Sequence, residues 1–167
     1  MQDNQIANET ANENTIQTAI QTKPVTYGGF WKRVAAYIID WLILMLLSFV
    51  LMIIMGVFLA FKGLDPEDET AMLGVSLMGN LITLMLTWFY YAGMESSSKQ
   101  GTFGKSLLGM KVTDLNGGRI SFLRASARYF SKILSALLLF IGFIMVAFTE
   151  KKQGLHDMIA ATLVVNK

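Results

Sequence analysis

The chain has 167 residues, of which 53% are hydrophobic and 16% are charged, and its formal net charge is +2. A soluble domain carries about a quarter charged residues, so this composition excludes an ordinary soluble protein. The absence of cysteine excludes disulfide frameworks and thiolate metal sites, the single histidine excludes a multi-histidine zinc site, and the small net charge gives no indication of a nucleic-acid partner.

Residues 1–27 are predicted to form a disordered polar tail. They are rich in Gln, Asn and Thr and have too little apolar surface to fold alone. No basic segment precedes an apolar run there, so the tail does not have the pattern of a signal peptide. Residues 28–167 are expected to form a single membrane domain.

Two long stretches nearly free of charge predict membrane-spanning helices over residues 33–61 and 72–94. About 20 helical residues cross a hydrocarbon core of roughly 30 Å, and both stretches are long enough. Aromatic and basic residues at 30–33 precede the first span, and Trp88 to Tyr91 lie near the end of the second. Such residues are typical anchors at a membrane interface.

The distribution of charge predicts an orientation in the membrane. The loop at 62–69 is acidic, whereas the region 95–132 contains seven lysines and arginines against Glu95 and Asp114. Cytoplasmic loops carry an excess of lysine and arginine. We therefore expect a multi-pass protein of the cell (inner, or cytoplasmic) membrane, with the N-terminus and the 95–132 region in the cytoplasm.

The basic region contains a predicted β-hairpin and an amphipathic helix. Met110 to Asp114 reads as a strand, the turn residues 116–118 follow, and 119–121 are expected to return as the second strand. Arg124, Arg128 and Lys132 then recur every fourth residue, which places them on one helical face suited to lipid headgroups.

The third hydrophobic segment, 133–149, is at the short limit for a span and contains Gly142. If it crosses completely, Lys151 and Lys152 lie outside, against the charge rule. If it is re-entrant, the C-terminus stays in the cytoplasm and 162–165 can join the hairpin as a third strand. The predicted fold class is thus an all-α membrane protein with three hydrophobic helical segments and a small cytoplasmic β-hairpin. Both alternatives stay open for the third segment, with the complete span as the default.

Asp40 is the most informative single residue, because a carboxylate inside an apolar span must be paired, neutralised or hydrated. Arg33, Tyr37 and Asp40 are spaced i, i+4, i+7 and share one face of the first helix. One interpretation is structural, with Asp40 holding a cation or hydroxyl across a helix interface. The other is an ion or proton site, since intramembrane carboxylates recur in proton relays.

A polar stripe follows one face of the second span, and its members are Asn80, Thr83, Thr87, Tyr91 and Glu95. Polar side chains at this spacing commonly join helices by hydrogen bonds, each worth on the order of 1 kcal/mol. The alternative is a hydrophilic pathway opposite Asp40.

Two other motifs do not indicate catalysis. The segment 101–106 ends like a phosphate-binding loop, but Lys99 stands where its first glycine belongs. His156 and Asp157 are adjacent, whereas two members of a hydrolytic triad must face each other and need a nucleophile. We therefore expect no enzyme, no cofactor and no resident metal.

Three separated blocks resemble the RDD family of small membrane proteins, which is named for one arginine and two aspartates. The first is Phe30-x-x-Arg33-x-x-Ala36-x-x-x-Asp40, the second runs from Gly101-Thr102-x-Gly104-Lys105 to Ile120, and the third is Gly154-Leu155-His156-Asp157 with Thr162-x-Val164-Val165. Arg33, Asp40 and Asp157 match the three defining positions. Ala161 is a departure, because the family usually has a glycine before Thr162.

The resemblance implies a compact membrane domain with three hydrophobic segments. Some members of the family are regarded as transporters, with sodium/proton antiport proposed. Asp40 would then bind the proton or cation, and Arg33 and Asp157 would orient or gate. Two or three hydrophobic segments cannot easily enclose a transport pathway, so antiport implies a homo-oligomer. The expected partners are then a monovalent cation and protons, besides membrane lipid. The alternative is a non-catalytic membrane scaffold or accessory subunit in which these three residues are structural.

Overall fold

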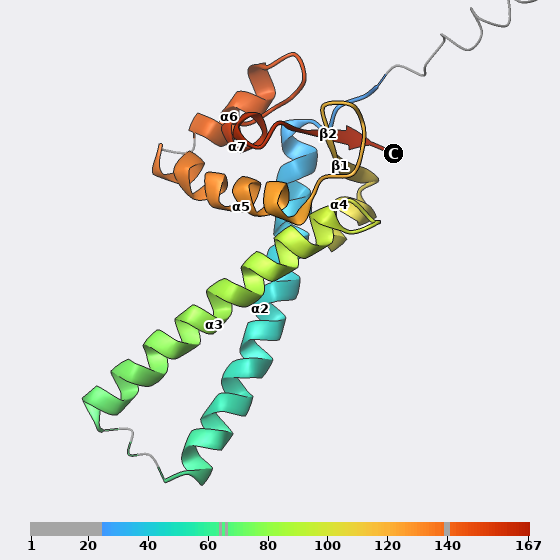
Figure 1. Cartoon of the computed structure of the whole chain (residues 1–167). Helices are drawn as coiled ribbons and strands as arrows, with labels where there is room; N and C mark the ends of the chain where they lie inside the picture. Colours follow the sequence, from blue (N-terminus) through green and yellow to red (C-terminus); the bar gives the residue numbers. More distant parts are fainter. Residues whose placement is uncertain (1–24, 64, 66, 139–140) are drawn as a thin grey trace, which may run out of the picture.

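The computed structural model describes residues 25–63, 65, 67–138 and 141–167. The tail predicted over 1–27 therefore lies almost entirely outside the described residues. Within them the chain is mostly helical, and its helices and strands follow the order α2, α3, α4, β1, α5, α6, α7 and β2 (Figure 1).

Two long apolar helices, α2 (Phe30–Phe61) and α3 (Glu69–Ser96), confirm the two predicted spans and extend each by about a turn or less. Asp68 caps α3, because its side chain accepts hydrogen bonds from the amides of Thr70 and Ala71 at 3.0 and 3.1 Å. The two helices separate toward the loop that joins them (Figure 1). In neither helix is any residue of the most apolar 18-residue window buried.

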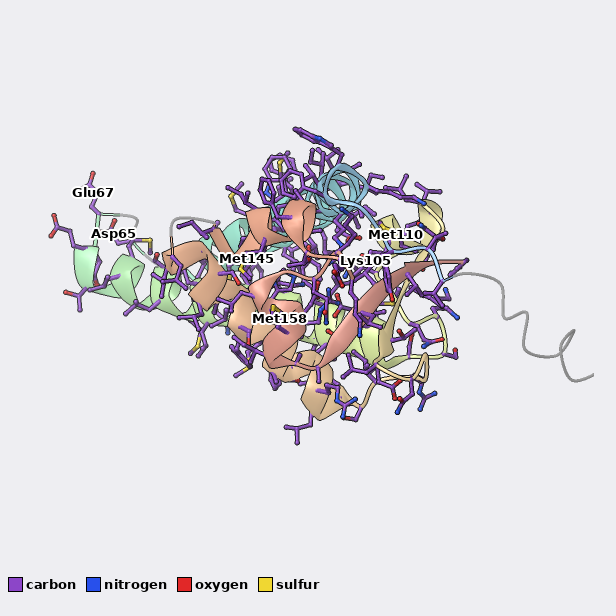
Figure 2. All side chains as sticks on the ribbon, turned by 90° about the horizontal axis from the view of Figure 1, so that it is seen from above. Asp65, Glu67, Lys105, Met110, Met145 and Met158 are labelled. Atoms are coloured by element: carbon purple, nitrogen blue, oxygen red, sulfur yellow. The ribbon has the colours of Figure 1, made fainter. Side chains whose placement is uncertain are left out.

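The remaining elements gather at the other end of the two long helices (Figure 1). They are α4 (Phe103–Leu107), β1 (Met110–Asp114), α5 (Phe122–Leu137), α6 (Ile141–Phe148), α7 (Leu155–Ile159) and β2 (Thr162–Asn166). We call residues 25–40, 90–138 and 141–167 the head, and residues 41–61 and 69–89 the shaft. Viewed from above, Asp65 and Glu67 lie at the far end of the shaft from Lys105 and Met110 (Figure 2).

The small sheet is confirmed, but its second strand is not the predicted one. β1 pairs antiparallel with β2, with Val112 opposite Val164, while 119–121 form no strand. Residues 115–118 only make a turn, with Gly117 at φ +84° and the amide of Asp114 donating to the carbonyl of Gly118 at 2.9 Å. The apolar residues of β2 make a better pairing partner for β1 than the short, more polar segment 119–121. The long-range pairing therefore replaces the local hairpin.

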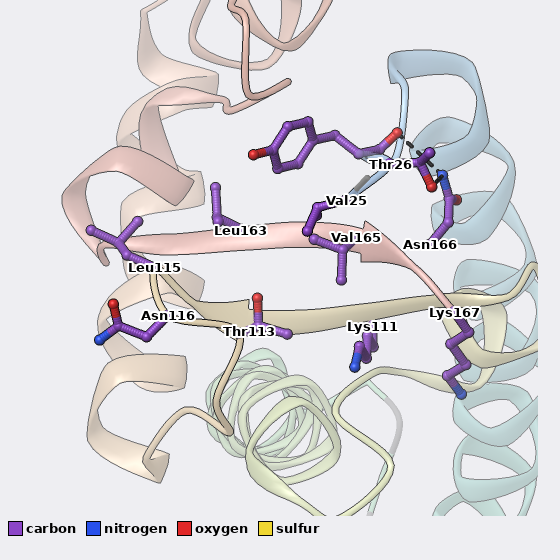
Figure 3. Close-up of a pocket in the computed structure, with 12 residues that line it drawn as sticks. Val25, Thr26, Lys111, Thr113, Leu115, Asn116, Leu163, Val165, Asn166 and Lys167 are labelled. Atoms are coloured by element: carbon purple, nitrogen blue, oxygen red, sulfur yellow. Dashed lines mark hydrogen bonds between the residues drawn. The ribbon is translucent and has the colours of Figure 1, made fainter. Parts of the chain in front are cut away.

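Residues 25–28 lie along the outer edge of β2. The amide of Gly28 donates to the carbonyl of Val164 at 2.8 Å, and Tyr27 forms a bridge with Val165. The side chain of Asn166 donates to the hydroxyl of Thr26 at 3.2 Å and to the carbonyl of Tyr27 at 3.3 Å (Figure 3). The start of α2 and the C-terminal strand are thereby fixed to each other.

The third hydrophobic segment is broken into α5 and α6, which are inclined by 102°. α6 packs against α5, α7 and the head end of α2. Because β2 lies beside β1 and residues 25–28, the chain returns to the head after α6. A bent pair of this kind is either a broken span or a re-entrant segment, so both alternatives for 133–149 stay predictions.

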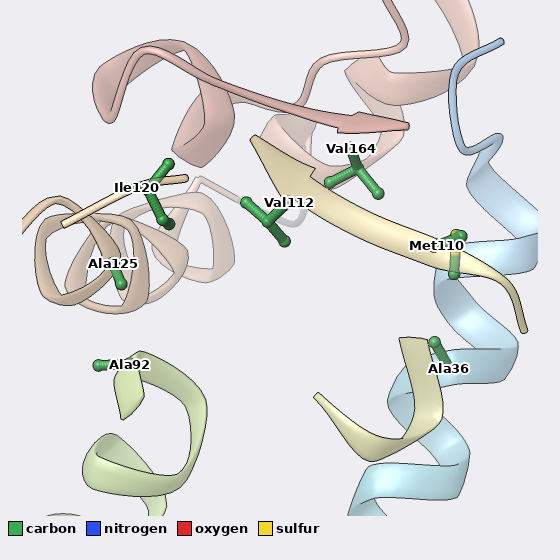
Figure 4. Close-up of a cluster of buried hydrophobic side chains, with 7 residues drawn as sticks. All are labelled: Ala36, Ala92, Met110, Val112, Ile120, Ala125 and Val164. Carbon is green, nitrogen blue, oxygen red and sulfur yellow. The ribbon is translucent and has the colours of Figure 1, made fainter. Parts of the chain in front are cut away.

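The apolar core of the head is small. It consists of short or medium side chains from five helices and strands and from the segment before α5, with Trp88 and Leu108 packed against it: Ala36, Ala92, Met110, Val112, Ile120, Ala125 and Val164 (Figure 4). A core of this size leaves the mutual positions of α2, α3, α5 and α7 dependent on other contacts. Aromatic rings of α3 pack on those of α5, and ion pairs join all four helices.

Candidate functional site: a buried ionic network in the head

Arg128 on α5 is the centre of a buried ionic network. Its Nε and Nη2 lie 2.8 and 2.6 Å from Oδ1 of Asp157 on α7, and its Nη1 lies 2.9 Å from Oε2 of Glu95 on α3. All three side chains are at most 1% exposed. One guanidinium thus joins three helices, using the planar arrangement of donors that suits arginine to carboxylates.

Arg33 brings α2 into the same network. Its Nη1 is paired with Oδ2 of Asp157, its Nε donates to the carbonyl of Gly28 at 2.8 Å, and its Nη2 donates to the carbonyl of Lys152 at 2.5 Å. The first helix is therefore tied to α7 and to the loop that precedes it. The sequence pairs neither Arg33 nor Asp157 with any particular partner, and the structure pairs them with each other.

Two lysines complete the surroundings of Glu95. Lys105 on α4 donates to Oε1 at 2.6 Å, and Lys132 on α5 lies 3.7 Å from the same oxygen with its ammonium over the ring of Tyr91. The network contains four cationic side chains, Arg33, Lys105, Arg128 and Lys132, against the two carboxylates of Glu95 and Asp157.

This arrangement determines the ionisation of groups outside the long helices. Burial alone would raise the pKa of Asp157, but Arg128 and Arg33 outweigh burial and hold this pKa well below its usual range. Burial, together with the nearby Arg128, lowers the pKa of Lys105 to about 7, although Glu95 acts in the opposite direction. Asp157 is thus charged at neutral pH, and burial makes Lys105 release its proton more readily than an exposed lysine does.

Local structure presents these side chains to one another. Ser121 caps α5 by accepting from the amide of Arg124 at 3.2 Å, and α5 then carries Arg128 on its buried face one turn later. At α7, the amide of Gly154 donates to Oδ2 of Asp157 at 3.1 Å, so that Asp157 also closes the first turn of its own helix. An N-terminal carboxylate is favourable there because of the helix dipole.

Asp40 is buried but lies outside the ionic network. It is 1% exposed, and its Oδ1 accepts hydrogen bonds from the hydroxyl of Tyr90 and the amide of Gly104, both at 2.8 Å. The same hydroxyl accepts from the amide of Phe103 at 3.2 Å. Asp40 and Tyr90 therefore bind the first turn of α4 to both long helices through neutral donors.

The glycine at position 104 is required by this contact. A Cβ placed on Gly104 would lie 2.2 Å from the carbonyl oxygen of Ala36 on α2. Thr102 caps α4 by accepting from the amide of Lys105 at 3.4 Å, and Lys105 reaches Glu95. The segment that resembles the end of a phosphate-binding loop thus packs closely on α2 and supplies the network with a cation.

His156 is buried beside the network. Its ring lies 5.1 Å from that of Phe143, and its Nε2 lies 3.5 Å from Oδ1 of Asp157. Burial lowers the pKa of His156 to about 3 even though Asp157 raises it, so the ring is neutral at physiological pH. Its Nδ1 has no hydrogen-bond partner among the described residues.

The other sequence-predicted site residues are dispersed. Of the polar stripe, Glu95 belongs to the network and Tyr91 packs on Tyr129, whereas Asn80 and Thr83 are exposed on the shaft. Thr87 donates to the carbonyl of Thr83 at 2.7 Å within the helix. Tyr37 is exposed and does not share the surroundings of Asp40, although it lies on the same helix.

Sequence reasoning missed the roles of Arg128, Lys105 and Tyr90. The prediction that Arg128 faces lipid headgroups is wrong, because it is buried between two carboxylates; Arg124, one turn earlier, is exposed. The available signal was the need of a buried Glu95 and a buried Asp157 for cations. Pattern alone does not say which of the evenly spaced cations meets that need.

Comparison with known proteins identifies a family whose match includes the residues of the ionic network. A profile of the RDD family matches residues 27–161. This range includes both long helices, α4, β1, α5, α6 and α7, and hence every member of the network. No solved structure is significantly similar to the chain.

Several curated proteins are similar along most of the chain. "Uncharacterized protein YxaI" of Bacillus subtilis (strain 168) is 42% identical over 147 residues, covering 83% of this chain and 97% of YxaI. "Uncharacterized membrane protein YteJ" of the same organism is 34% identical over 147 residues, covering 84% and 82%. "Proline-rich antigen homolog" of Mycobacterium tuberculosis (strain ATCC 25618 / H37Rv) is 26% identical over 162 residues, covering 88% and 67%.

Proposed function

Because the chain belongs to the RDD family and is a membrane protein, we propose that it acts as a non-catalytic membrane scaffold or accessory subunit in which Arg33, Asp40 and Asp157 are structural. The shaft anchors the protein in the bilayer. The head is held in one arrangement by its buried ionic network and is the part available to partners.

The single observation that carries this proposal is the continuous chain of ion pairs from Arg33 through Asp157 and Arg128 to Glu95. It connects α2, α7, α5 and α3, and its central side chains are at most 1% exposed. Removing one partner of a buried ion pair destabilises the fold strongly, typically by about 3–5 kcal/mol. The burial and fixed pairing of these side chains support a structural role, since a transport site must release its ion.

The proposed orientation places the head in the cytoplasm and the loop 62–69 outside. All lysines and arginines except Lys23 and Lys62 belong to the head, whereas the loop contains Asp65, Glu67, Asp68 and Glu69. This distribution is the one that the positive-inside rule describes. Since α6 returns to the head, the C-terminal strand lies on the cytoplasmic side in this proposal.

A second candidate is cation/proton antiport through Asp40, and one observation favours it. Asp40 is buried at the head end of the first span, and both of its hydrogen-bond donors among the described residues are neutral. A carboxylate without a fixed cation can exchange a proton for a sodium ion. The long helices barely contact each other in the shaft, so antiport requires a homo-oligomer to enclose a pathway.

Asp40→Asn separates the two candidates. Asparagine keeps an acceptor for Tyr90 and Gly104 but removes the charge, so the scaffold proposal predicts a modest loss of thermal stability in detergent and no cation-dependent proton flux in wild-type proteoliposomes. Asp65→Asn, in the exposed loop, is the matched control. Flux with Na⁺, K⁺ or Li⁺ that the wild type shows and a stably folded Asp40→Asn variant loses would replace the scaffold with the antiporter.

A further inference from the structure

A shallow groove of about 340 Å³ lies beside α4, and its residues have two kinds of chemistry. Met94 at the end of α3 and Phe103 and Leu107 on α4 are apolar. Lys99, Ser106 and Lys167 supply two ammonium groups and a hydroxyl. Phe103, Ser106 and Leu107 are spaced i, i+3, i+4 and therefore share one face of the short helix.

The apolar part of the groove lies at the depth where the shaft begins. The amides of Phe103 and Gly104 donate hydrogen bonds to Tyr90 and Asp40, so α4 is fixed against the long helices where the head meets the shaft. From Trp41 to Phe61 the first helix rises roughly 30 Å, the thickness of the hydrocarbon core. Phe103 and Leu107 are 56% and 67% exposed at this boundary, which places apolar surface where acyl chains begin.

The lysines lie on the other side of that boundary. Lys99 follows the end of α3 at Ser96. Lys167 follows β2, and its amide donates to the carbonyl of Gly109 at 2.9 Å. Both side chains are exposed, and no ion pair occupies either of them among the described residues. The groove thus places two lysines that form no ion pair among the described residues next to apolar surface.

From this arrangement we propose that the groove binds one anionic phospholipid of the surrounding bilayer. Lys99 and Lys167 receive the phosphate of the headgroup, and an acyl chain lies along Met94, Phe103 and Leu107. The charge of the site selects an anionic over a zwitterionic headgroup, and the apolar face selects a lipid over a free phosphate. This inference depends on the membrane placement of the shaft and is independent of the scaffold role.

The test uses the full chain in a zwitterionic detergent, with phosphatidylglycerol or phosphatidylcholine added and bound lipid counted by native mass spectrometry. Phosphatidylglycerol should bind more tightly than phosphatidylcholine. The double variant Lys99→Gln/Lys167→Gln should weaken phosphatidylglycerol about tenfold and leave phosphatidylcholine unchanged. The matched control, Lys111→Gln/Lys151→Gln, removes two lysines that line no part of this groove and should retain the native preference.

Leu107→Gln separates a lipid from a free anion. It keeps both lysines and removes apolar contact, so it should weaken phosphatidylglycerol, while glycerol 1-phosphate should fail to displace the lipid. Displacement by glycerol 1-phosphate at equal concentration overturns the proposal, as does equal loss in the control pair. A dimer that the groove variants dissociate would assign the groove to a second copy of the chain and would likewise overturn it.

Discussion

The head and the shaft use opposite means to keep their shape. In the head, seven small or medium apolar residues are buried beside a network of six charged side chains, of which Glu95, Lys105, Arg128 and Asp157 are buried as well. In the shaft, the most apolar window of each helix has no buried residue, and the two helices barely contact each other. The fold is therefore specified at one end of the molecule, while the other end relies on the bilayer to cover it.

The largest expected effect is the loss of the central guanidinium. Arg128→Ala leaves Glu95 and Asp157 buried with fewer cations, and it should lower the free energy of unfolding by about 3–5 kcal/mol. SDS titration in mixed micelles measures this quantity. Arg124→Ala, one turn earlier on the same helix but exposed, should change it by less than about 0.5 kcal/mol. Equal effects of the two variants would show that the network does not hold the head.

A pair of methionines compares the apolar contribution of the two regions. Met110→Ala removes a fully buried side chain from the head and should cost about 2–5 kcal/mol. Met52→Ala makes the same chemical change at a side chain that is 62% exposed on the shaft, and it should be nearly neutral. The same SDS titration measures both variants. If Met52→Ala costs as much as Met110→Ala, the shaft is packed against protein and not only against lipid or detergent.

A pair of glycines makes the comparison with an added methyl group. Gly104→Ala places a Cβ against the backbone of Ala36, and overpacking of this kind costs about 1–3 kcal/mol. Gly79→Ala in the shaft meets no atom of the described residues within 4 Å and should stabilise α3 slightly, since alanine is the better helix former. Thermal unfolding followed by circular dichroism measures both. A stabilising Gly104→Ala would contradict the close approach of α4 to α2.

The smallest expected effect is a dependence of stability on pH. The pKa of His156 is lowered to about 3 in the folded protein from an ordinary value of 6.5, so the unfolded chain takes up the proton first as pH falls. Stability should thus decrease by about 1 kcal/mol between pH 7 and pH 5.5. His156→Gln should remove most of this slope, and an unchanged slope in the variant would contradict the burial of a neutral ring.

Sequence patterns predicted the shaft well, because hydrophobic length alone determines where a helix can cross a bilayer. They also identified Asp40 as a costly carboxylate that needs a partner. They did not predict that β1 pairs with β2, since the turn residues at 116–118 favour a local hairpin and a pairing across about fifty residues depends on tertiary packing. Burial explains the error at Arg128 as well: the spacing of Arg124, Arg128 and Lys132 places them on one face but does not say what covers that face.

The central claim is that Glu95 and Asp157 are coupled energetically through Arg128. The two carboxylates lie on different helices, and Arg128 forms an ion pair with each of them. A double-mutant cycle with Glu95→Gln and Asp157→Asn, measured by SDS titration, tests it directly. We predict that the two losses are not additive and that the interaction energy lies in the range of about 0.5–3 kcal/mol expected for one network. Losses that add within about 0.3 kcal/mol would contradict a shared network in the head.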